Sequence, residues 1–336
     1  MAKEKTIDFF QDEFKKYFDF DKNFNRISSS EKADGNEYDV YLTDIKKEFQ
    51  NDPESGSVII KELSFQQAAT YSQISSGWNP YLETIYGVLE KEGHYISVHE
   101  FVKAPESLIW ENRSLSLEEY ITHFGCFSET DALILLWQLC EGVKALQKLN
   151  LTHGDIAPQN ILLTDACRWE EFCSPLPNTS GKISLKLIDF GITKEKKNSD
   201  HEVTTVMGTK PFAAPEILDF RYPTDRVDIY SIGCILHYMV TGKSPKETDM
   251  KQSKKRISRR TYYITRRCTA GYEKRYHNIP KLQKEILYQY RNSANMIYRI
   301  LSYMPGQKSS SLPMQIMTFC LYTAILILWL SFLEGM

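Results

Sequence analysis

Residues 152–163 read THGDIAPQNILL, and they place Asp155 and Asn160 five residues apart on a short segment. His153 precedes the aspartate, and the apolar tail is typical of a β-strand. Gly154 and Ala157, the two small residues around Asp155, leave the segment without any positive charge. A carboxylate and an amide held between apolar elements make this segment a candidate functional loop.

Further motifs are found on both sides of this loop. An apolar run that is typical of a strand leads into LIDFG, which contains Asp189. GTKPFAAPEIL follows and contains Glu216, and an apolar helical pattern over residues 225–241 then carries Asp228 and stops at Gly242. Upstream, VIIKEL places Lys61 after three consecutive β-branched residues. Residues 20–102 alternate strand-like runs, among them 57–63 and 83–89, with turns. From about Leu115 helical periodicity dominates, and Ser128 is the expected N-cap of a helix over 130–149.

This ordered set of motifs resembles the eukaryotic-like protein kinase superfamily over about residues 20–310. The resemblance implies an α+β, two-lobed protein-kinase-like fold, with a small β-rich N-lobe and a larger helical C-lobe. We expect an N-terminal extension at 1–19, the N-lobe at 20–102 and the C-lobe at 103–310. A polar insert at 165–182 and a basic segment at 251–267 belong to the C-lobe.

The resemblance also implies roles for individual residues in the use of ATP and Mg²⁺. Asp155 would accept or orient the hydroxyl of a protein substrate, and Asn160 and Asp189 would bind the metal. The residues expected to contact the nucleotide are Lys61 at the α- and β-phosphates, Ser29 and Gly35 in the phosphate-covering loop, and Glu100 and Val102 in the connector beside adenine.

The chain departs from the family pattern at several positions. Gly154 replaces an arginine that usually pairs with a phosphate on the activation loop, and Ala157 replaces a lysine that is typical of Ser/Thr kinases. The helix after Lys61 contains no acid to pair with that lysine, which leaves Gln66 or Gln67 as a neutral partner. In the C-lobe, Glu216 needs a cation, for which Arg299 or Lys308 is a candidate.

Three functional hypotheses remain open. The first is a protein kinase, with Ser/Thr favoured over Tyr because Pro158 and the pair Gly208–Thr209 are typical of Ser/Thr enzymes. The second is a pseudokinase scaffold with weak or no phosphotransfer, which the single glycine of the phosphate-covering loop favours. The third is a small-molecule kinase of the aminoglycoside phosphotransferase type, which shares the HGD loop but not the APE segment.

The 336 residues include 42% apolar and 25% charged side chains, as in globular proteins. Seven scattered cysteines, with no metal-binding spacing, favour free thiols in a reducing compartment. The N-terminus has no apolar signal segment. Residues 309–333 contain no charge, and 314–333 are long enough for a transmembrane helix. The sequence predicts a single-pass C-terminal membrane anchor with the kinase domain in the cytoplasm.

Residues 251–267, from Lys251 to Arg267, read KQSKKRISRRTYYITRR and contain eight basic residues and no acid. One interpretation is a solvated, partly disordered loop. Another is contact with anionic lipid headgroups, because each basic residue near such a surface contributes about 1 kcal/mol. The remaining interpretation is an acidic substrate or nucleic acid, and we do not expect nucleic acid as a partner.

Overall fold

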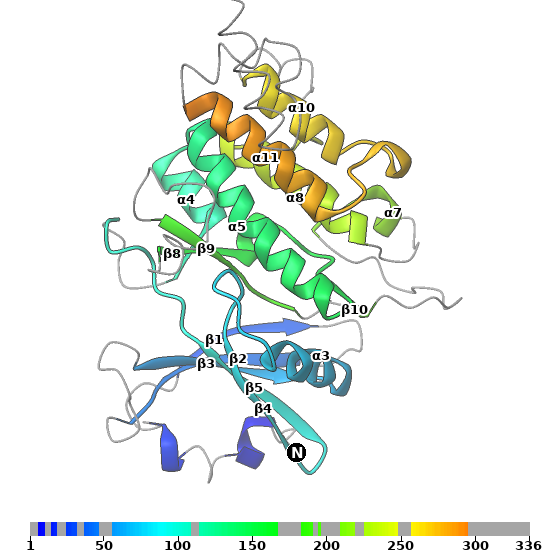
Figure 1. Ribbon diagram of the computed structural model, residues 1–336. Helices are drawn as coiled ribbons and strands as arrows, with labels where there is room; N and C mark the ends of the chain where they lie inside the picture. Colours follow the sequence, from blue (N-terminus) through cyan, green and yellow to red (C-terminus); the bar gives the residue numbers. More distant parts are fainter. Residues whose placement is uncertain are drawn as a thin grey trace, which may run out of the picture.

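The computed structural model describes residues 6–10, 15–18, 25–31, 37–46, 56–108, 114–166, 183–190, 194–195, 209–218, 225–247 and 257–294. A strand-rich part and a helix-rich part follow one another in the chain, and Figure 1 shows them as two lobes. The coarse two-lobed α+β prediction is therefore confirmed.

The N-lobe is built on an antiparallel five-stranded sheet in the order β1-β2-β3-β5-β4. Alternation fixes its register, because Val58 and Ile60 of the central strand point into the core and are almost fully buried. One helix, α3 (Phe65–Ser75), packs on this sheet and begins at a capping box made by Ser64 and Gln67. The strands are β1 (Asn25–Glu31), β2 (Glu37–Asp44), β3 (Ser57–Leu63), β4 (Ile85–Lys91) and β5 (His94–Glu100).

The C-lobe packs around α5 (Glu129–Lys148), which is buried along most of its length. Helix α8 (Asp225–Thr241) packs against α5, and α10 (Arg259–Cys268) and α11 (Ile279–Ala294) complete the bundle. The remaining elements are η1 (Thr6–Phe10), β6 (Leu115–Ser116), α4 (Leu117–Phe124), β7 (Leu151–Thr152), η3 (Pro158–Asn160), β8 (Ile161–Asp165), β9 (Ile183–Leu187), β10 (Lys194–Glu195), α7 (Pro215–Leu218) and η4 (Tyr272–Lys274).

Several sequence-predicted elements are confirmed. The strand over 57–63 and the helix over 225–241 have the expected bounds, and Ser128 caps α5 as predicted. The strand expected to begin at Glu83 begins instead at Ile85, and the serine-rich strand β1 was not predicted. The expectation of a solvated loop over 251–267 is wrong for its second half, because residues 259–268 form α10.

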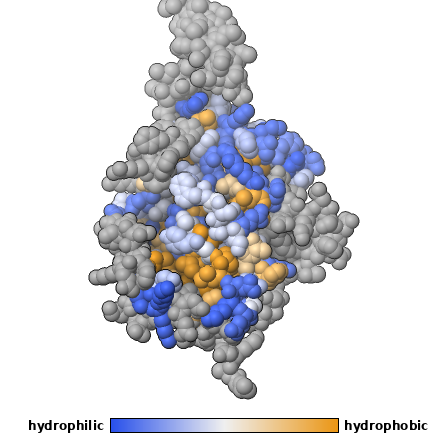
Figure 2. All heavy atoms as spheres, turned by 60° about the horizontal axis from the view of Figure 1, so that its bottom comes forward, coloured by the Kyte–Doolittle hydropathy of each residue, from blue (hydrophilic) through white to orange (hydrophobic). Residues whose placement is uncertain are grey.

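Some large apolar side chains of the N-lobe face solvent. Figure 2 brings the sheet end of the molecule forward and shows apolar residues among hydrophilic ones. Phe65, Trp78 and Tyr86 are each at least 60% exposed and come from α3, the turn after it and β4. The outer side of α3 and β4 is therefore partly apolar.

Within the described ranges, no helix is both long and apolar enough to cross a membrane. The predicted transmembrane segment 314–333 lies outside those ranges. So do Gly35, residues 251–256 and most of the polar insert. The predictions made for these residues stay predictions.

Helices α8 and α10 approach each other closely at Gly233. A Cβ atom at this position would overlap the Cβ atom of Cys268. We expect Gly233→Ala to destabilise the protein, because overpacking costs about 1–3 kcal/mol and outweighs a helix-propensity gain of up to about 1 kcal/mol. Thermal unfolding measures the change. Gly87→Ala is the control, since nothing lies within 4 Å of its new methyl group. An unchanged unfolding midpoint for Gly233→Ala would contradict this prediction.

Candidate active site

The fully buried Asp228 of α8 holds the candidate catalytic loop in place. The backbone N–H groups of His153 and Gly154 donate to its two carboxylate oxygens, at 3.0 and 2.9 Å. Gly154 has a φ of 80°, in the left-handed region that glycine adopts without steric cost. A buried carboxylate and a glycine thus set the path of the chain just before Asp155.

Aromatic rings connect this loop to the N-lobe. His153 packs edge-on against Phe190 with ring centroids 5.7 Å apart, and Phe190 contacts Tyr71 of α3 at 5.9 Å. Tyr71 in turn contacts the ring of His99 at the end of β5, at 5.4 Å. The His153 ring also accepts from the Asp155 N–H and faces the carbonyl of Ile188, so its orientation is determined on two sides.

Asp155 and Asn160 lie together, as their spacing in the sequence predicts. The Asn160 Nδ2 amide donates to the Asp155 backbone carbonyl at 2.9 Å and to its Oδ2 atom at 3.1 Å. Oδ1 of Asp155 accepts two further bonds, from the N–H and the hydroxyl of Thr209, at 2.7 and 2.9 Å. These contacts hold the carboxylate in one orientation and join the loop to the segment that begins at Thr209.

Asp189 lies two residues after the end of β9, is solvent-exposed and has a φ of 62°. Ile188, its neighbour, donates its N–H to the carbonyl of Asn160 at 2.9 Å, which brings the two predicted metal ligands onto adjacent backbones. Asn160 uses its amide nitrogen for Asp155, so its Oδ1 atom is the one left for a metal. A carboxylate and an amide oxygen are a donor set that suits Mg²⁺, and the residues present therefore fit this ion.

Lys61 of β3 is also close to this site, but its partner was not predicted. Its Nζ atom lies 3.0 Å from both carboxylate oxygens of Glu83, in the segment before β4. Gln67 forms the capping box of α3 instead, with its Oε1 atom accepting from the Ser64 N–H. The suggestion that Gln66 or Gln67 pairs with Lys61 is therefore wrong. Glu83 is a single acid at the start of an apolar run, and nothing in the sequence around it indicates that it pairs with Lys61.

Electrostatics tie Glu83 to the same region. Burial alone would raise the pKa of Glu83, but His99 and Lys61 outweigh burial and lower that pKa to about 2. Burial lowers the pKa of His99 itself below its usual range, against the effect of Glu83. Burial also raises the pKa of the Tyr71 hydroxyl, and the charges of Asp189 and Glu83 raise it further. Both acids are therefore near the aromatic column.

The other predicted nucleotide contacts are less closely grouped. The Glu100 carboxylate binds Lys186 of β9 at 2.6 Å and the Thr84 N–H at 2.5 Å, while the carbonyl of Val102 accepts from Ser114 at 2.6 Å. Ser29 lies within β1, opposite Asp39, rather than in a loop. Gly35 lies outside the described residues. The structure brings Lys61, Asp155, Asn160 and Asp189 to the interface of the lobes, and their roles stay predictions.

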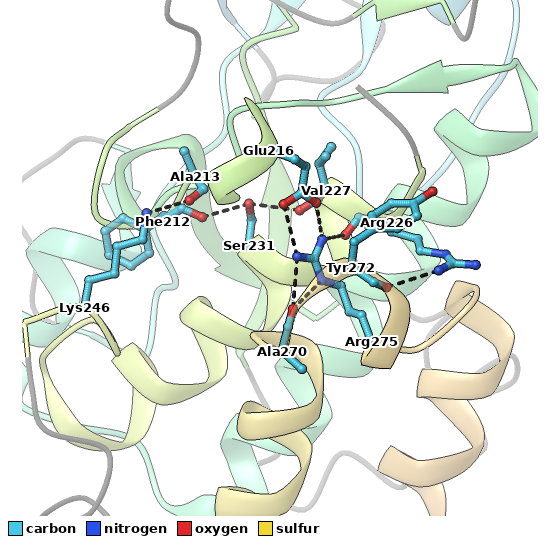
Figure 3. Close-up of polar contacts among 10 residues, drawn as sticks. All are labelled: Phe212, Ala213, Glu216, Arg226, Val227, Ser231, Lys246, Ala270, Tyr272 and Arg275. Atoms are coloured by element: carbon cyan, nitrogen blue, oxygen red, sulfur yellow. Dashed lines mark hydrogen bonds and ion pairs between the residues drawn. The ribbon is translucent and has the colours of Figure 1, made fainter. Parts of the chain in front are cut away.

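Within the described residues, the cation that holds Glu216 is Arg275, which the sequence did not predict. The expected partners Arg299 and Lys308 lie outside the described residues. The Arg275 guanidinium is fully buried and donates to both Glu216 oxygens, at 2.5 and 3.2 Å (Figure 3). It also donates to the carbonyls of Arg226 and Ala270. One side chain thus joins the segment after Thr209 to α8 and to the turn after α10. Arg275 was missed because it is one of many cations in a basic region.

Comparison with known proteins agrees with the two-lobed fold. Residues 40–318 match the model of the family described as protein kinase domain. The chain therefore belongs to the protein kinase family.

Two of its relatives illustrate the match. The chain is 33% identical over 174 residues to serine/threonine-protein kinase 17A of Oryctolagus cuniculus, covering 52% of this chain and 38% of that protein. It is 32% identical over 135 residues to the probable serine/threonine-protein kinase PknB of Corynebacterium glutamicum, covering 39% of this chain and 18% of that protein. The matches thus span well under half the length of these relatives.

We expect Arg275→Met to destabilise the protein by about 3–5 kcal/mol, because removing one partner leaves a largely buried carboxylate without its cation. Arg275→Lys keeps the charge but loses the planar fork and should fall in between. Chemical denaturation measures the free energy of unfolding. Arg266→Met, at an exposed position of α10, is the control and should stay within about 0.5 kcal/mol of wild type. Equal stabilities of Arg275→Met and the control would refute the prediction.

Proposed function

We propose that this chain transfers the γ-phosphate of ATP to a hydroxyl group of a protein substrate, with Ser/Thr favoured over Tyr. The observation that carries the proposal is the grouping of Asp155, Asn160 and Asp189 on segments that Asp228 and β9 hold in place. Relatives named as serine/threonine-protein kinases support the same chemistry.

Asp155 is the residue that would orient the substrate. A carboxylate offers about four lone-pair positions, and three are taken by the two donors of Thr209 and by Asn160. The fourth can accept the hydroxyl of a serine or threonine and aim its oxygen at the phosphorus atom. Bound Mg²⁺ would neutralise the phosphate charges, with Asn160 and Asp189 as its protein ligands. Lys61 would hold the α- and β-phosphates through its ammonium group.

An Asp155→Asn variant tests this role. We expect its rate of protein phosphorylation to fall by about 10²–10⁴-fold, because the amide cannot accept the hydroxyl proton. Incubation of the full chain with γ-labelled ATP, Mg²⁺ and casein, followed by phosphoamino-acid analysis, measures both the rate and the acceptor residue. Asp165→Asn, an exposed change of the same type in β8, is the control.

Two outcomes would count against the proposal. Equal labelling by wild type and Asp155→Asn would remove Asp155 from the reaction. Binding of Mg-ATP without any labelling by wild type would favour a pseudokinase scaffold.

We further propose that the chain is anchored in a membrane by residues 314–333 and that α10 contacts anionic headgroups beside that anchor. The support for the anchor is the uncharged run of 25 residues from 309 to 333. Helix α10 turns Thr261, Ile264 and Cys268 inward, while Arg259 and Arg266 face solvent together with the half-exposed Tyr263. Its outer face is thus basic and aromatic, as at membrane interfaces.

Vesicle sedimentation of the full chain tests the headgroup contact. We expect Arg259→Gln/Arg266→Gln to weaken binding to vesicles containing phosphatidylserine by about 2 kcal/mol, roughly 30-fold, since each charge contributes about 1 kcal/mol. Binding to pure phosphatidylcholine vesicles, which depends on the apolar segment, should not change. Lys103→Gln/Lys148→Gln removes two exposed charges elsewhere and serves as the control. An equal loss in both double variants would argue against α10 as the contact.

A further inference from the structure

The partner of Lys61 comes from an unexpected place in the fold. Helix α3 reads FQQAATYSQIS and contains no acid, although it lies directly after Lys61 in the chain and packs on the same sheet. Glu83 instead comes from the extended segment between α3 and β4, and its two oxygens both lie 3.0 Å from Lys61 Nζ. The lysine side chain is only 14% exposed and that of the acid 4%, so the pair is largely shielded from water.

Backbone hydrogen bonds fix the position of Glu83 on both sides. Its N–H donates to the carbonyl of Leu187 at 3.0 Å, and the Leu187 N–H donates to Tyr81 at 2.9 Å. The next residue, Thr84, exchanges hydrogen bonds with Glu100 of β5. Leu187 ends β9, two residues before Asp189. Glu83 is thus attached to the strand that leads to the candidate metal ligand, and not to a helix.

His99 completes the surroundings of the carboxylate. Its Nδ1 atom lies 3.2 Å from Glu83 Oε2, and its Nε2 atom lies 2.6 Å from the Ser97 hydroxyl. The ring is fully buried and packs against Tyr71. Lys61 therefore binds the Glu83 carboxylate through both of its oxygens, and the buried His99 ring lies beside Oε2.

This geometry still leaves Lys61 able to bind a ligand. An ammonium group has three donors, and two of them are directed at Glu83. The third can reach a phosphate oxygen, while the two bonds to the carboxylate hold the ammonium group in place. Glu83 thus holds the Lys61 ammonium group in place, as an acid on the neighbouring helix α3 would do.

We propose that Glu83 is the positioning residue for Lys61 in nucleotide binding, and that the pair is set by the junction of β3, β5 and β9 rather than by α3. The proposal rests on the proposed function, because it assigns Lys61 to the phosphates of ATP. Its consequence is that a movement of α3 does not make or break this ion pair.

The test measures the affinity of the full chain for Mg-ATP by isothermal titration calorimetry, and the phosphorylation rate in parallel. Glu83→Gln keeps the shape and removes the charge, and we expect it to weaken ATP binding at least tenfold. Glu83→Asp, which keeps the charge on a shorter side chain, should recover part of that loss. Glu90→Gln makes the same change at an exposed position of β4 and should bind as wild type does.

Two further variants separate positioning from a merely structural role. In a Lys61→Met background, Glu83→Gln should cause no additional loss of affinity, because its effect passes through the lysine. Gln67→Ala, on α3, should leave the affinity within about twofold of wild type. Additive losses in the double variant would overturn the proposal, and so would a Gln67→Ala loss as large as that of Glu83→Gln.

The outcomes also distinguish this proposal from the proposed function. Wild-type binding of Mg-ATP without phosphorylation would refute the transfer reaction and leave the affinity comparison valid. Phosphorylation with an unchanged affinity in Glu83→Gln would refute the role of Glu83 alone. A wild-type chain that does not bind Mg-ATP would refute both.

Discussion

The hydrogen bonds between the buried Asp228 carboxylate and two successive backbone N–H groups are the interaction on which the site depends. A buried carboxylate without such donors would carry a large desolvation cost. The conformation of the loop and the position of α8 therefore depend on each other. From this anchor the chain places the partly buried Asp155 beside Asn160 and Thr209 and turns the His153 ring toward Phe190. The positive φ of Gly154 allows the chain to turn between His153 and Asp155 without strain.

Buried ion pairs then connect segments that are far apart in the chain. Arg275 joins Glu216 to α8, and Lys186 of β9 binds Glu100 at the end of β5. Each pair has further hydrogen bonds to backbone groups, which offset the cost of removing charge from water.

Much of this could be predicted from the sequence, because the decisive signals are local. The spacing of Asp155 and Asn160, the apolar run before Asp189 and the cap at Ser128 each act within a few residues. Pairings over long distances were missed. Neither the Lys61–Glu83 pair nor the Arg275–Glu216 pair leaves a pattern along the chain, since the tertiary fold alone brings these residues together.

The basic segment, residues 251–267, shows a second reason why the structure could not be predicted from the sequence. Its high charge suggested a solvated loop, but Thr261, Ile264, Thr265 and Cys268 recur at helical spacing and are buried. The inward face contains only one strongly apolar side chain, so a hydrophobic pattern is hard to see in the sequence. Likewise, the serines of β1 have low strand propensity, and pairing with β2 decides their conformation.

The backbone pairing between Tyr81, Glu83 and Leu187 has a consequence for motion between the lobes. These bonds join residues 81–83, a segment of the N-lobe, to β9 in the C-lobe. Leu82 also forms a parallel bridge with Leu187. When the sheet tilts over the helical bundle, residues 81–83 must stay with β9. A rotation that kept these bonds would therefore pivot close to Leu187.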